Sequence, residues 1–278
     1  MNIISNDNTI TLNEVENFNI KQTLECGQAF RFELINDRYK IIAKNKILYV
    51  KENTFYTTKK DFEEIWLDYF DLKKDYSLIQ NKLCEDSIMK KAIEYGKGIR
   101  ILNQDKFEML ISFIISQNNR IPMIKKVINN ISEKYGTDLG DGYAFPTVEQ
   151  LSKANINELM ECKTGFRAKY IMDALEKVNT LDLNKLDQLP TPELKEKLKE
   201  INGVGDKVAN CISLFGYGRC DSFPIDVWIK RIMEHFYYNS QDTNKNIITA
   251  DAIKMFGQYC GYAQQYLFYY AREEKIGK

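Results

Sequence analysis

The stretch INGVGDKVANC, residues 201–211, places two glycines between two apolar helical segments. Gly203 allows the positive φ of a tight turn, and the absent side chain lets another group approach the backbone. A helix that starts just after Gly205 would point free backbone N–H groups at an anion such as a DNA phosphate. The pattern predicts a helix-hairpin-helix over about 193–216 that grips phosphate. A plain helix end at Gly203 is the alternative interpretation.

A lysine and an aspartate near this turn suit a reaction. Lys207 falls in the first turn of the second helix, where the helix dipole disfavours a cation by roughly 0.3 to 1 kcal/mol. The dipole and desolvation together would lower the pKa of the amine and make it a nucleophile. Asp226 follows Pro224 and precedes an amphipathic run, so it is expected to cap the next helix. Its carboxylate would also stabilise a developing cation, whereas the alternative is a solvated lysine beside a purely structural cap.

The composition is that of an ordinary globular chain. Its 278 residues are 44% hydrophobic, and 39 basic residues balance 39 acidic ones. Zero net charge argues against strong non-specific DNA binding by the whole chain, so a DNA-binding face must be locally basic. The cations near the candidate motifs predict such a face: Arg120, Lys125, Lys126, Lys163, Arg167, Lys169 and Lys207.

The lack of recognisable targeting signals and the cysteine spacing predict a cytosolic protein. No stretch of about 18 or more apolar residues is present, and residues 1–8 lack a basic region followed by an apolar one. We therefore expect neither a membrane span nor a signal peptide. The six cysteines are scattered without the spacing of a zinc site, and cytosolic thiols are normally reduced, so no disulfides are expected.

Hydrophobic periodicity predicts an α+β fold with the strands first. Alternating runs indicate an antiparallel sheet, and a helical period replaces them from about residue 61. We predict an N-terminal β-rich domain with some helix over 1–95 and a mostly helical domain over 96–278. The expected strands cover residues 9–12, 29–34, 39–43, 47–50 and 54–58.

Several helix boundaries are readable from single residues. Asp105 is expected to cap a helix, Pro122 to occupy the first turn of the next, and Thr147 to open a capping box. Gly96 is expected to end a helix that begins at Ile88.

Six blocks of the sequence together resemble the 8-oxoguanine DNA glycosylase branch of the helix-hairpin-helix DNA glycosylases. They occur in the order of that family and cover about residues 20–272: Cys26-Gly-Gln-Ala-Phe-Arg31, Phe113-Ile-Ile-Ser-Gln-Asn-Asn119, Gly165-Phe-Arg-Ala-Lys-Tyr170, Gly203-Val-Gly-Asp-Lys-Val-Ala-Asn-Cys211, Phe223-Pro-Ile-Asp-Val227 and Tyr262-Ala-Gln-Gln-Tyr-Leu-Phe268. The resemblance implies base excision on oxidised DNA.

The resemblance also implies a mechanism with two activities. The damaged nucleotide leaves the stack, because its glycosidic carbon is inaccessible within a duplex. Lys207 would attack C1′ as the base departs, and Asp226 would stabilise the sugar cation and help proton transfer. A Schiff base would then link enzyme and DNA, and loss of a C2′ proton would expel the 3′ phosphate.

Four residues are expected to form the base pocket. Oxidation turns guanine N7 into an N–H donor, so a backbone acceptor directed at N7 would reject guanine. Gly27 resembles that acceptor, Phe268 and Cys211 resemble the groups on the two faces of the flipped base, and Gln264 resembles the amide that reads the pyrimidine edge. The resemblance also implies an electrostatic pairing of Lys207 with Cys211. From the residues alone, a turn glycine, a core aromatic and a buried cysteine are the alternatives.

A second set of residues is expected to contact the DNA around the lesion. Asn118 resembles the residue that enters the vacated stack, Phe166 a wedge beside it, and Arg167 a reader of the opposite cytosine. The alternatives are an ordinary helix stop and a solvated cation. Met123 departs from the pattern, since the eukaryotic members have a second cytosine-reading arginine there. We expect it to cost about 1 to 3 kcal/mol of base selectivity.

Trp228 is the other departure, since it stands where those members have a phosphate-contacting histidine, and the phosphate contact is left open there. The resemblance implies a monomer that acts on double-stranded DNA containing 8-oxoguanine, at the nucleoid in a bacterial cytoplasm. It implies no required cofactor and no iron–sulfur cluster, with an optional structural monovalent cation at the hairpin and no other metal.

Three other classes of protein share part of this pattern. A monofunctional alkylpurine glycosylase has the turn and the aspartate but no lysine nucleophile at position 207. An iron–sulfur pyrimidine glycosylase needs four closely spaced C-terminal cysteines, whereas only Cys260 lies beyond Cys220. A non-catalytic module whose glycine turn only grips phosphate is the third alternative.

Overall fold

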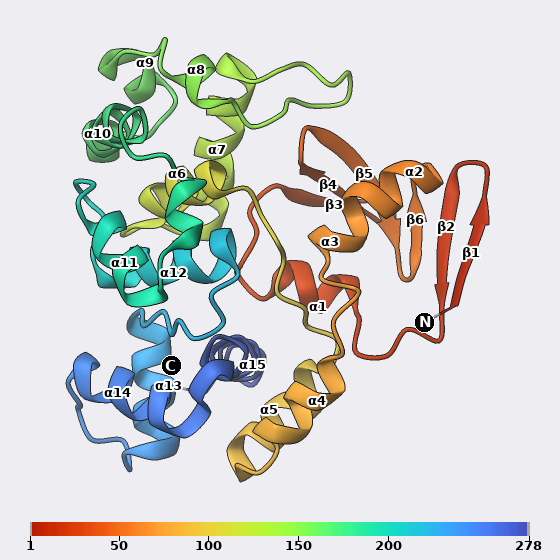
Figure 1. The fold of residues 1–278 in the computed structure, drawn as a ribbon, viewed down its shortest axis with the longest axis vertical. Helices are drawn as coiled ribbons and strands as arrows, with labels where there is room; N and C mark the ends of the chain where they lie inside the picture. Colours follow the sequence, from red (N-terminus) through yellow and green to blue (C-terminus); the bar gives the residue numbers. More distant parts are fainter. Residues whose placement is uncertain (1, 277–278) are drawn as a thin grey trace.

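Six antiparallel strands form one sheet, in the order β1-β2-β6-β5-β4-β3, within residues 2–276, which the computed structural model describes (Figure 1). The strands are β1 Asn2–Asn6, β2 Thr9–Asn13, β3 Phe32–Ile35, β4 Arg38–Ala43, β5 Lys46–Lys51 and β6 Thr54–Tyr56. Side chains alternate across the sheet, and the inward set includes Ile10, Leu48 and Phe55. Four of the five predicted strands match β2, β4, β5 and β6 closely.

The remaining predicted strand, 29–34, is partly wrong. The ladder begins only at Phe32, because Phe30 packs into the hydrophobic core of the helices instead of the sheet. Strand β1 was not predicted. All five of its residues are exposed, so it carries no alternation of buried and exposed positions that a pattern would reveal.

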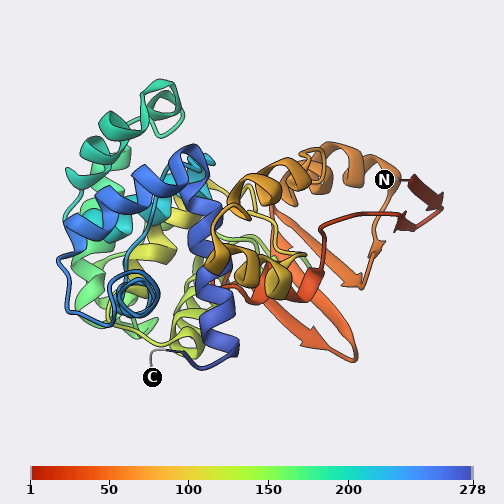
Figure 2. The same ribbon diagram turned by 90° about the horizontal axis from the view of Figure 1, so that it is seen from below.

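Helices make up most of the rest of the chain, and Figure 2 shows them beside the sheet. The fold is therefore α+β, an antiparallel sheet followed by a mostly helical part, as predicted. The helices are α1 Ile20–Glu25, α2 Lys59–Asp61, η1 Phe62–Trp66, α3 Leu67–Tyr69, α4 Tyr76–Leu83, α5 Ser87–Gly96, α6 Lys106–Ser116, α7 Ile121–Tyr135, α8 Val148–Leu151, α9 Ile156–Glu161, η2 Gly165–Arg167, α10 Ala168–Val178, η3 Lys185–Gln188, α11 Thr191–Lys199, α12 Asp206–Tyr217, α13 Val227–Tyr237, α14 Lys245–Phe256, η4 Gly257–Tyr259 and α15 Cys260–Glu273.

Most of the predicted helix boundaries are confirmed. The Asp105 carboxylate accepts hydrogen bonds from the backbone N–H groups of Phe107 and Glu108, both at 2.9 Å, at the start of α6. Pro122 lies in the first turn of α7, and Thr147 forms a reciprocal capping box with Gln150. These signals are local, so tertiary packing did not override them.

The predicted helix end at Gly96 is confirmed, whereas the predicted C-cap role of this glycine is not. Gly96 is the last residue of α5, and Lys97 follows it as the cap. A Cβ atom at Gly96 would lie 2.8 Å from Cδ1 of Ile99 and 3.4 Å from the ring of Tyr269. Close packing against α15 therefore explains this glycine.

The buried apolar residues form two hydrophobic cores. The smaller core lies under the sheet and runs from Ile10 to Leu72, with Leu102 added, whereas the larger core holds the helices from Tyr76 onward. Helices α4 and α5 fall within the predicted N-terminal domain, yet their apolar residues belong to the larger core, and α5 packs on α15. The boundary at residue 95 stays a prediction.

None of the helices in the described residues has both the length and the apolar character that a membrane crossing requires. All six cysteines are free thiols.

Candidate active site

Helices α11 and α12 form the predicted helix-hairpin-helix. Gly203 adopts a φ of +86°, and a Cβ atom there would lie 2.6 Å from the ring of Tyr170. The Asp173 carboxylate accepts hydrogen bonds from the Asn202 backbone N–H at 2.7 Å and from its side-chain amide at 2.6 Å. This turn is thus tied to α10. Gly205 precedes α12, whose N-terminus has no side-chain cap, so its N–H groups are available to an anion.

Lys207 is the second residue of α12, as predicted, and its side chain is partly buried. The amine lies 5.4 Å from the centroid of the Phe113 ring and 3.4 Å from the Ser116 hydroxyl. That hydroxyl donates to the Phe113 carbonyl at 2.8 Å. Helix α6 therefore supplies an aromatic wall and a hydroxyl that position the amine.

Asp226 is the N-cap of α13, as predicted. Its carboxylate accepts a hydrogen bond from the backbone N–H of Ile229 at 2.7 Å. One carboxylate oxygen thus holds the helix start, while the side chain also lines the same cavity as Lys207. The bond to Ile229 occupies only one carboxylate oxygen, so Asp226 can cap α13 and also have a catalytic role. The cap therefore does not establish the alternative that Asp226 is purely structural.

A cavity of about 480 Å³ brings the predicted residues together, and a recess of about 60 Å³ adjoins it. Four of the predicted residues line both spaces: Gly27, Lys207, Asp226 and Phe268. They come from segments that lie far apart in the chain. Trp228 lines the larger cavity only. Cys211 and Gln264 line the recess only.

The recess is narrow because a glycine faces an aromatic ring. Gly27 adopts a φ of +89°, and a Cβ atom there would lie 3.0 Å from Cε1 of Phe268. Gln264 is buried, and its side-chain oxygen accepts a hydrogen bond from Gln265 Nε2 at 2.7 Å. One recess is therefore lined by Gly27, Phe268 and Gln264. The alternative of an unrelated turn glycine and core aromatic does not account for this arrangement.

Cys211 and Lys207 line the same recess. Burial raises the pKa of the Cys211 thiol above its usual value, and Asp226 adds to this, although Lys207 opposes the rise. The electrostatic pairing of Lys207 with Cys211 stays a prediction.

The loop predicted to enter the DNA stack has a strained residue held by a buried arginine. Asn118 adopts a φ of +47°, which is uncommon for a residue other than glycine. The Arg167 guanidinium donates to the carbonyl oxygens of Gln117 at 2.8 Å, Asn118 at 2.9 Å and Thr164 at 3.3 Å. Arg167 is only 8% exposed, so the solvated-cation interpretation was wrong. Its role as a reader of cytosine stays a prediction.

Three other predicted DNA contacts are exposed, as an intermolecular contact requires. Phe166 is 52% exposed and lies edge-on to Tyr170, with ring centroids 6.0 Å apart. Met123 and Trp228 are 43% and 42% exposed. Whether each touches DNA stays a prediction.

The predicted basic face needs one correction. The Lys125 amine donates to the Phe32 carbonyl at 2.9 Å and lies 3.4 Å from the centroid of the Phe32 ring. Burial lowers the pKa of this amine. Lys125 thus joins α7 to the edge strand β3, because the aromatic side chain and a free strand carbonyl offer it a partner that the sequence does not reveal.

Sequence reasoning missed several residues of the cavity. Phe113 and Ser116 sit three residues apart on α6, and Arg272 sits four residues beyond Phe268 on α15. Both spacings place side chains on one helix face. Helical spacing from an already suspected residue was therefore the signal that would have found them.

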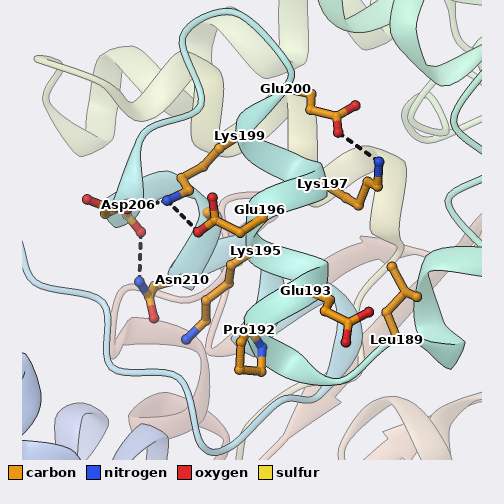
Figure 3. A pocket seen from close by; sticks show the side chains of 11 residues that line it. Leu189, Pro192, Glu193, Lys195, Glu196, Lys197, Lys199, Glu200, Asp206 and Asn210 are labelled. Atoms are coloured by element: carbon orange, nitrogen blue, oxygen red, sulfur yellow. Dashed lines mark hydrogen bonds and ion pairs between the residues drawn. The ribbon is translucent and has the colours of Figure 1, made fainter.

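A second hollow, of about 590 Å³, lies against α11 and the start of α12 (Figure 3). Several of its charged side chains pair with one another. Lys199 pairs with Glu196 at 2.7 Å and with Asp206 at 3.0 Å, and Lys197 pairs with Glu200 at 2.8 Å. None of the predicted site residues lines it. Across residues 2–276, no group of three or more His, Cys, Asp or Glu side chains is arranged to hold a metal ion.

Two family models match the chain in succession. Residues 10–110 match the 8-oxoguanine DNA glycosylase N-terminal domain, and residues 111–256 match the HhH-GPD superfamily base excision DNA repair protein. The match with the second model includes both Lys207 and Asp226.

Individual relatives agree with these models. A probable N-glycosylase/DNA lyase of Methanothermobacter thermautotrophicus is 30% identical over 245 residues, which cover 79% of this chain and 77% of the relative. An N-glycosylase/DNA lyase of Saccharomyces cerevisiae is 34% identical, over 62% of this chain and 56% of the yeast protein. Among solved structures, the Clostridium acetobutylicum 8-oxoguanine glycosylase/lyase bound to double-stranded DNA with cytosine opposite 8-oxoguanine is 41% identical. Its TM-score is 0.95, over 99% of both chains.

Proposed function

Because the chain belongs to the HhH-GPD superfamily of base excision DNA repair proteins, with an 8-oxoguanine DNA glycosylase N-terminal domain, we propose that it excises 8-oxoguanine and then cuts the strand. It is a DNA N-glycosylase with AP lyase activity. The observation that carries this function is the convergence of Lys207, Asp226, Gly27 and Phe268 on one cavity. The cavity accepts a flipped nucleotide, and duplex DNA containing the lesion is the substrate.

The base excision step uses Lys207 and Asp226. The unprotonated Lys207 amine bonds to C1′ as the bond from C1′ to the base nitrogen breaks, and the base leaves with that electron pair. The Asp226 carboxylate stabilises the positive charge that develops on the sugar, because it is partly desolvated and already fixed by its bond to Ile229. It then accepts a proton from the new amine linkage.

Strand cleavage follows from the same covalent link. The sugar ring opens and leaves a protonated Schiff base between Lys207 and C1′, which acidifies the C2′ proton. When a general base removes that proton, a C2′–C3′ double bond forms and the 3′ phosphate departs with the electrons of the C3′–O bond. A lysine can catalyse this β-elimination, whereas a water nucleophile cannot.

Recognition of the lesion rests on the narrow recess. The N7–H of 8-oxoguanine would donate to the Gly27 carbonyl, whereas N7 of guanine would present a lone pair and leave the acceptor unsatisfied. The flipped base would stack on Phe268 with the Cys211 side chain on its other face. Gln264 supplies an amide that can donate and accept along the pyrimidine edge.

Selection of the opposite base is expected to be relaxed. The exposed Met123 side chain offers no hydrogen-bond donor to cytosine, and the Arg167 guanidinium already serves the Gln117 and Asn118 carbonyls. The two positions therefore support a proposal of weak preference for cytosine.

The setting of the reaction is also a proposal. The chemistry needs only an amine and a carboxylate, which supports a reaction without a cofactor. Backbone carbonyl oxygens of the hairpin are suitable ligands for a hard monovalent cation, which we propose as an optional structural ion. We further propose a monomer that works on the nucleoid in a bacterial cytoplasm.

Borohydride trapping tests the function directly. The parent protein and Lys207→Gln are incubated with a duplex containing 8-oxoguanine, with and without sodium borohydride. We expect the parent to release the base and form a covalent adduct, and the variant to form none. An active parent that never forms an adduct would be monofunctional, and a protein that binds the duplex without releasing base would be a binding module. Either outcome would reject the proposal.

A further inference from the structure

Arg272 occupies a position that the reaction described above does not use. It lies on α15, one helical turn beyond Phe268, and lines the cavity. Its guanidinium carbon is 5.9 Å from the centroid of the Phe268 ring and 5.4 Å from that of Tyr269. Glu273 pairs with the guanidinium at 3.0 Å, so the side chain is held from its outer side as well.

The same guanidinium also reaches the chain that leads into the recognition glycine. Its Nη1 donates a hydrogen bond to the backbone carbonyl of Glu25. Glu25 is the last residue of α1, and Gly27 follows two residues later. A carbonyl in the last turn of a helix has no partner within that helix, and a cation is favourable there. Arg272 therefore fixes the point where the chain leaves α1.

One side chain thus contacts both walls of the recess. The Arg272 guanidinium lies against the Phe268 ring. It reaches the Gly27 side of the recess through its hydrogen bond to the Glu25 carbonyl. The two walls also face each other across a narrow gap, in which a Cβ atom on Gly27 would meet Phe268 at 3.0 Å. A small shift of either wall would therefore change the separation between the Phe268 ring and Gly27, and Arg272 contacts both sides.

We propose that Arg272 is a positioning residue for lesion recognition, which holds the Gly27 carbonyl and the Phe268 ring at the separation that selects 8-oxoguanine. This inference rests on the proposed function. A single hydrogen bond to N7–H separates lesion from guanine, and its strength depends steeply on the distance and angle of the Gly27 carbonyl. A change of a few tenths of an ångström in that carbonyl would weaken excision of the lesion.

Within residues 2–276, no hydrogen bond or ion pair joins Arg272 to Lys207 or Asp226. Lys207 is held by Ser116 on α6, and Asp226 is held by the start of α13. A preformed abasic site has no base to place in the recess. Cleavage at such a site should therefore be insensitive to Arg272, which separates a recognition role from a general structural one.

The test compares two substrates under single-turnover conditions. Arg272→Met keeps the packing of the stem and removes the donor, whereas Arg272→Lys keeps a charged donor without the flat guanidinium. We expect Arg272→Met to excise 8-oxoguanine about 10- to 100-fold more slowly, with cleavage of an abasic duplex within about twofold of the parent. Arg272→Lys should recover part of the loss. Arg38→Met is the matched control, because its guanidinium lies 4.2 Å from the ring of Tyr56 on the sheet, and it should change neither rate.

Several results would overturn the inference. Equal loss on both substrates would assign Arg272 a structural role, and unchanged excision would remove any role. Melting temperatures of all variants identify a folding defect, in which case Arg272→Lys carries the comparison. A parent protein that is inactive on 8-oxoguanine would overturn the proposed function as well, whereas an active parent with either result above would overturn this inference alone.

Discussion

The Asp226 carboxylate accepts a hydrogen bond from the backbone N–H of Ile229 at 2.7 Å, while the same side chain lines the cavity that holds Lys207. The residue therefore combines a helix cap with a charge beside the reacting sugar. An amide retains the first property and loses the second, so the two contributions can be separated by substitution.

Asp226→Asn should remove the chemistry and keep the helix. Asparagine caps about as well as aspartate, so the melting temperature should change little, whereas excision should fall by about 10²- to 10⁴-fold because the charge is lost. Single-turnover excision and thermal unfolding measure the two effects. Asp226→Ala is the control, and it should also lose about 1 kcal/mol of stability. An asparagine variant with normal activity would show that charge at this position is unimportant.

Gly27→Ala should impair excision selectively. The φ of +89° strains an alanine, and its Cβ atom would press on Phe268 at 3.0 Å, so the recess would narrow. We expect excision of 8-oxoguanine to fall by about tenfold or more, with cleavage of a preformed abasic site largely kept. A variant that loses both activities to the same extent would show that Gly27 matters for folding instead of recognition.

Gly203→Ala and Gly205→Ala should behave differently although they are two residues apart. A Cβ atom at Gly203 would lie 2.6 Å from the Tyr170 ring, whereas one at Gly205 meets nothing within 4 Å. We expect the first substitution to cost about 1 to 3 kcal/mol of unfolding free energy and to weaken binding to undamaged duplex. The second should leave the unfolding free energy nearly unchanged. Denaturant unfolding and DNA titration at fixed salt provide the comparison.

Met123→Arg should sharpen the choice of opposite base. An arginine at this exposed position would give cytosine a charged hydrogen-bonding partner worth about 1 to 3 kcal/mol, roughly 5- to 150-fold in relative rate. The measurement is 8-oxoguanine excision opposite each of the four bases. Met123→Lys, which has a charge but no planar fork, is a useful comparison. Unchanged relative rates across the four duplexes would refute the expectation.

Glu108 predicts a pH dependence of stability. Burial raises the pKa of its carboxyl from 4.5 to about 7, although Arg31 opposes this shift; Asp105 and Lys44 also face the group. Since the folded state holds the Glu108 proton more tightly than the unfolded state, protonation of Glu108 stabilises the fold. This stabilisation is fully present below pH 4.5 and is lost as pH rises through 7.

The unfolding free energy of Glu108→Gln should therefore rise relative to that of the parent by roughly 2 to 3 kcal/mol as pH rises from 5 to 8. Denaturant unfolding at both pH values measures the difference. Glu149 and Glu108 line one cavity of about 470 Å³. A hydrogen bond from Thr147 lowers the pKa of Glu149, so Glu149→Gln should show no such gain. A constant difference between Glu108→Gln and the parent would reject the prediction.

Features that depend on neighbouring residues in the chain were predictable. Asp105, Asp226 and Thr147 cap their helices because the donor N–H groups lie within three residues. The candidate catalytic pair could likewise be proposed from the sequence, since the glycine turn, the lysine and the aspartate lie within one short segment. The predicted base pocket needed the family resemblance, because Gly27 and Phe268 are separated by most of the chain.

What could not be predicted depends on contacts between distant segments. Nothing near Arg167 in the sequence shows that its guanidinium is buried against the carbonyls of Gln117 and Asn118. The Lys125 contact with Phe32 and the Arg272 contact with Glu25 are equally non-local. Long cations adapt to whichever acceptor the fold brings near, so the sequence does not show which carbonyl each of them contacts.

The left-handed backbone of Asn118, fixed by Arg167, has a consequence for how the protein inspects DNA. If Asn118 enters the base stack as predicted, a loop whose backbone is fixed by Arg167 bears its ordering entropy on folding and not on each encounter with a duplex. Each insertion into an undamaged base pair would then start from a loop in the required conformation. Arg167→Ala should thus slow the search for damage more than the chemistry that follows it.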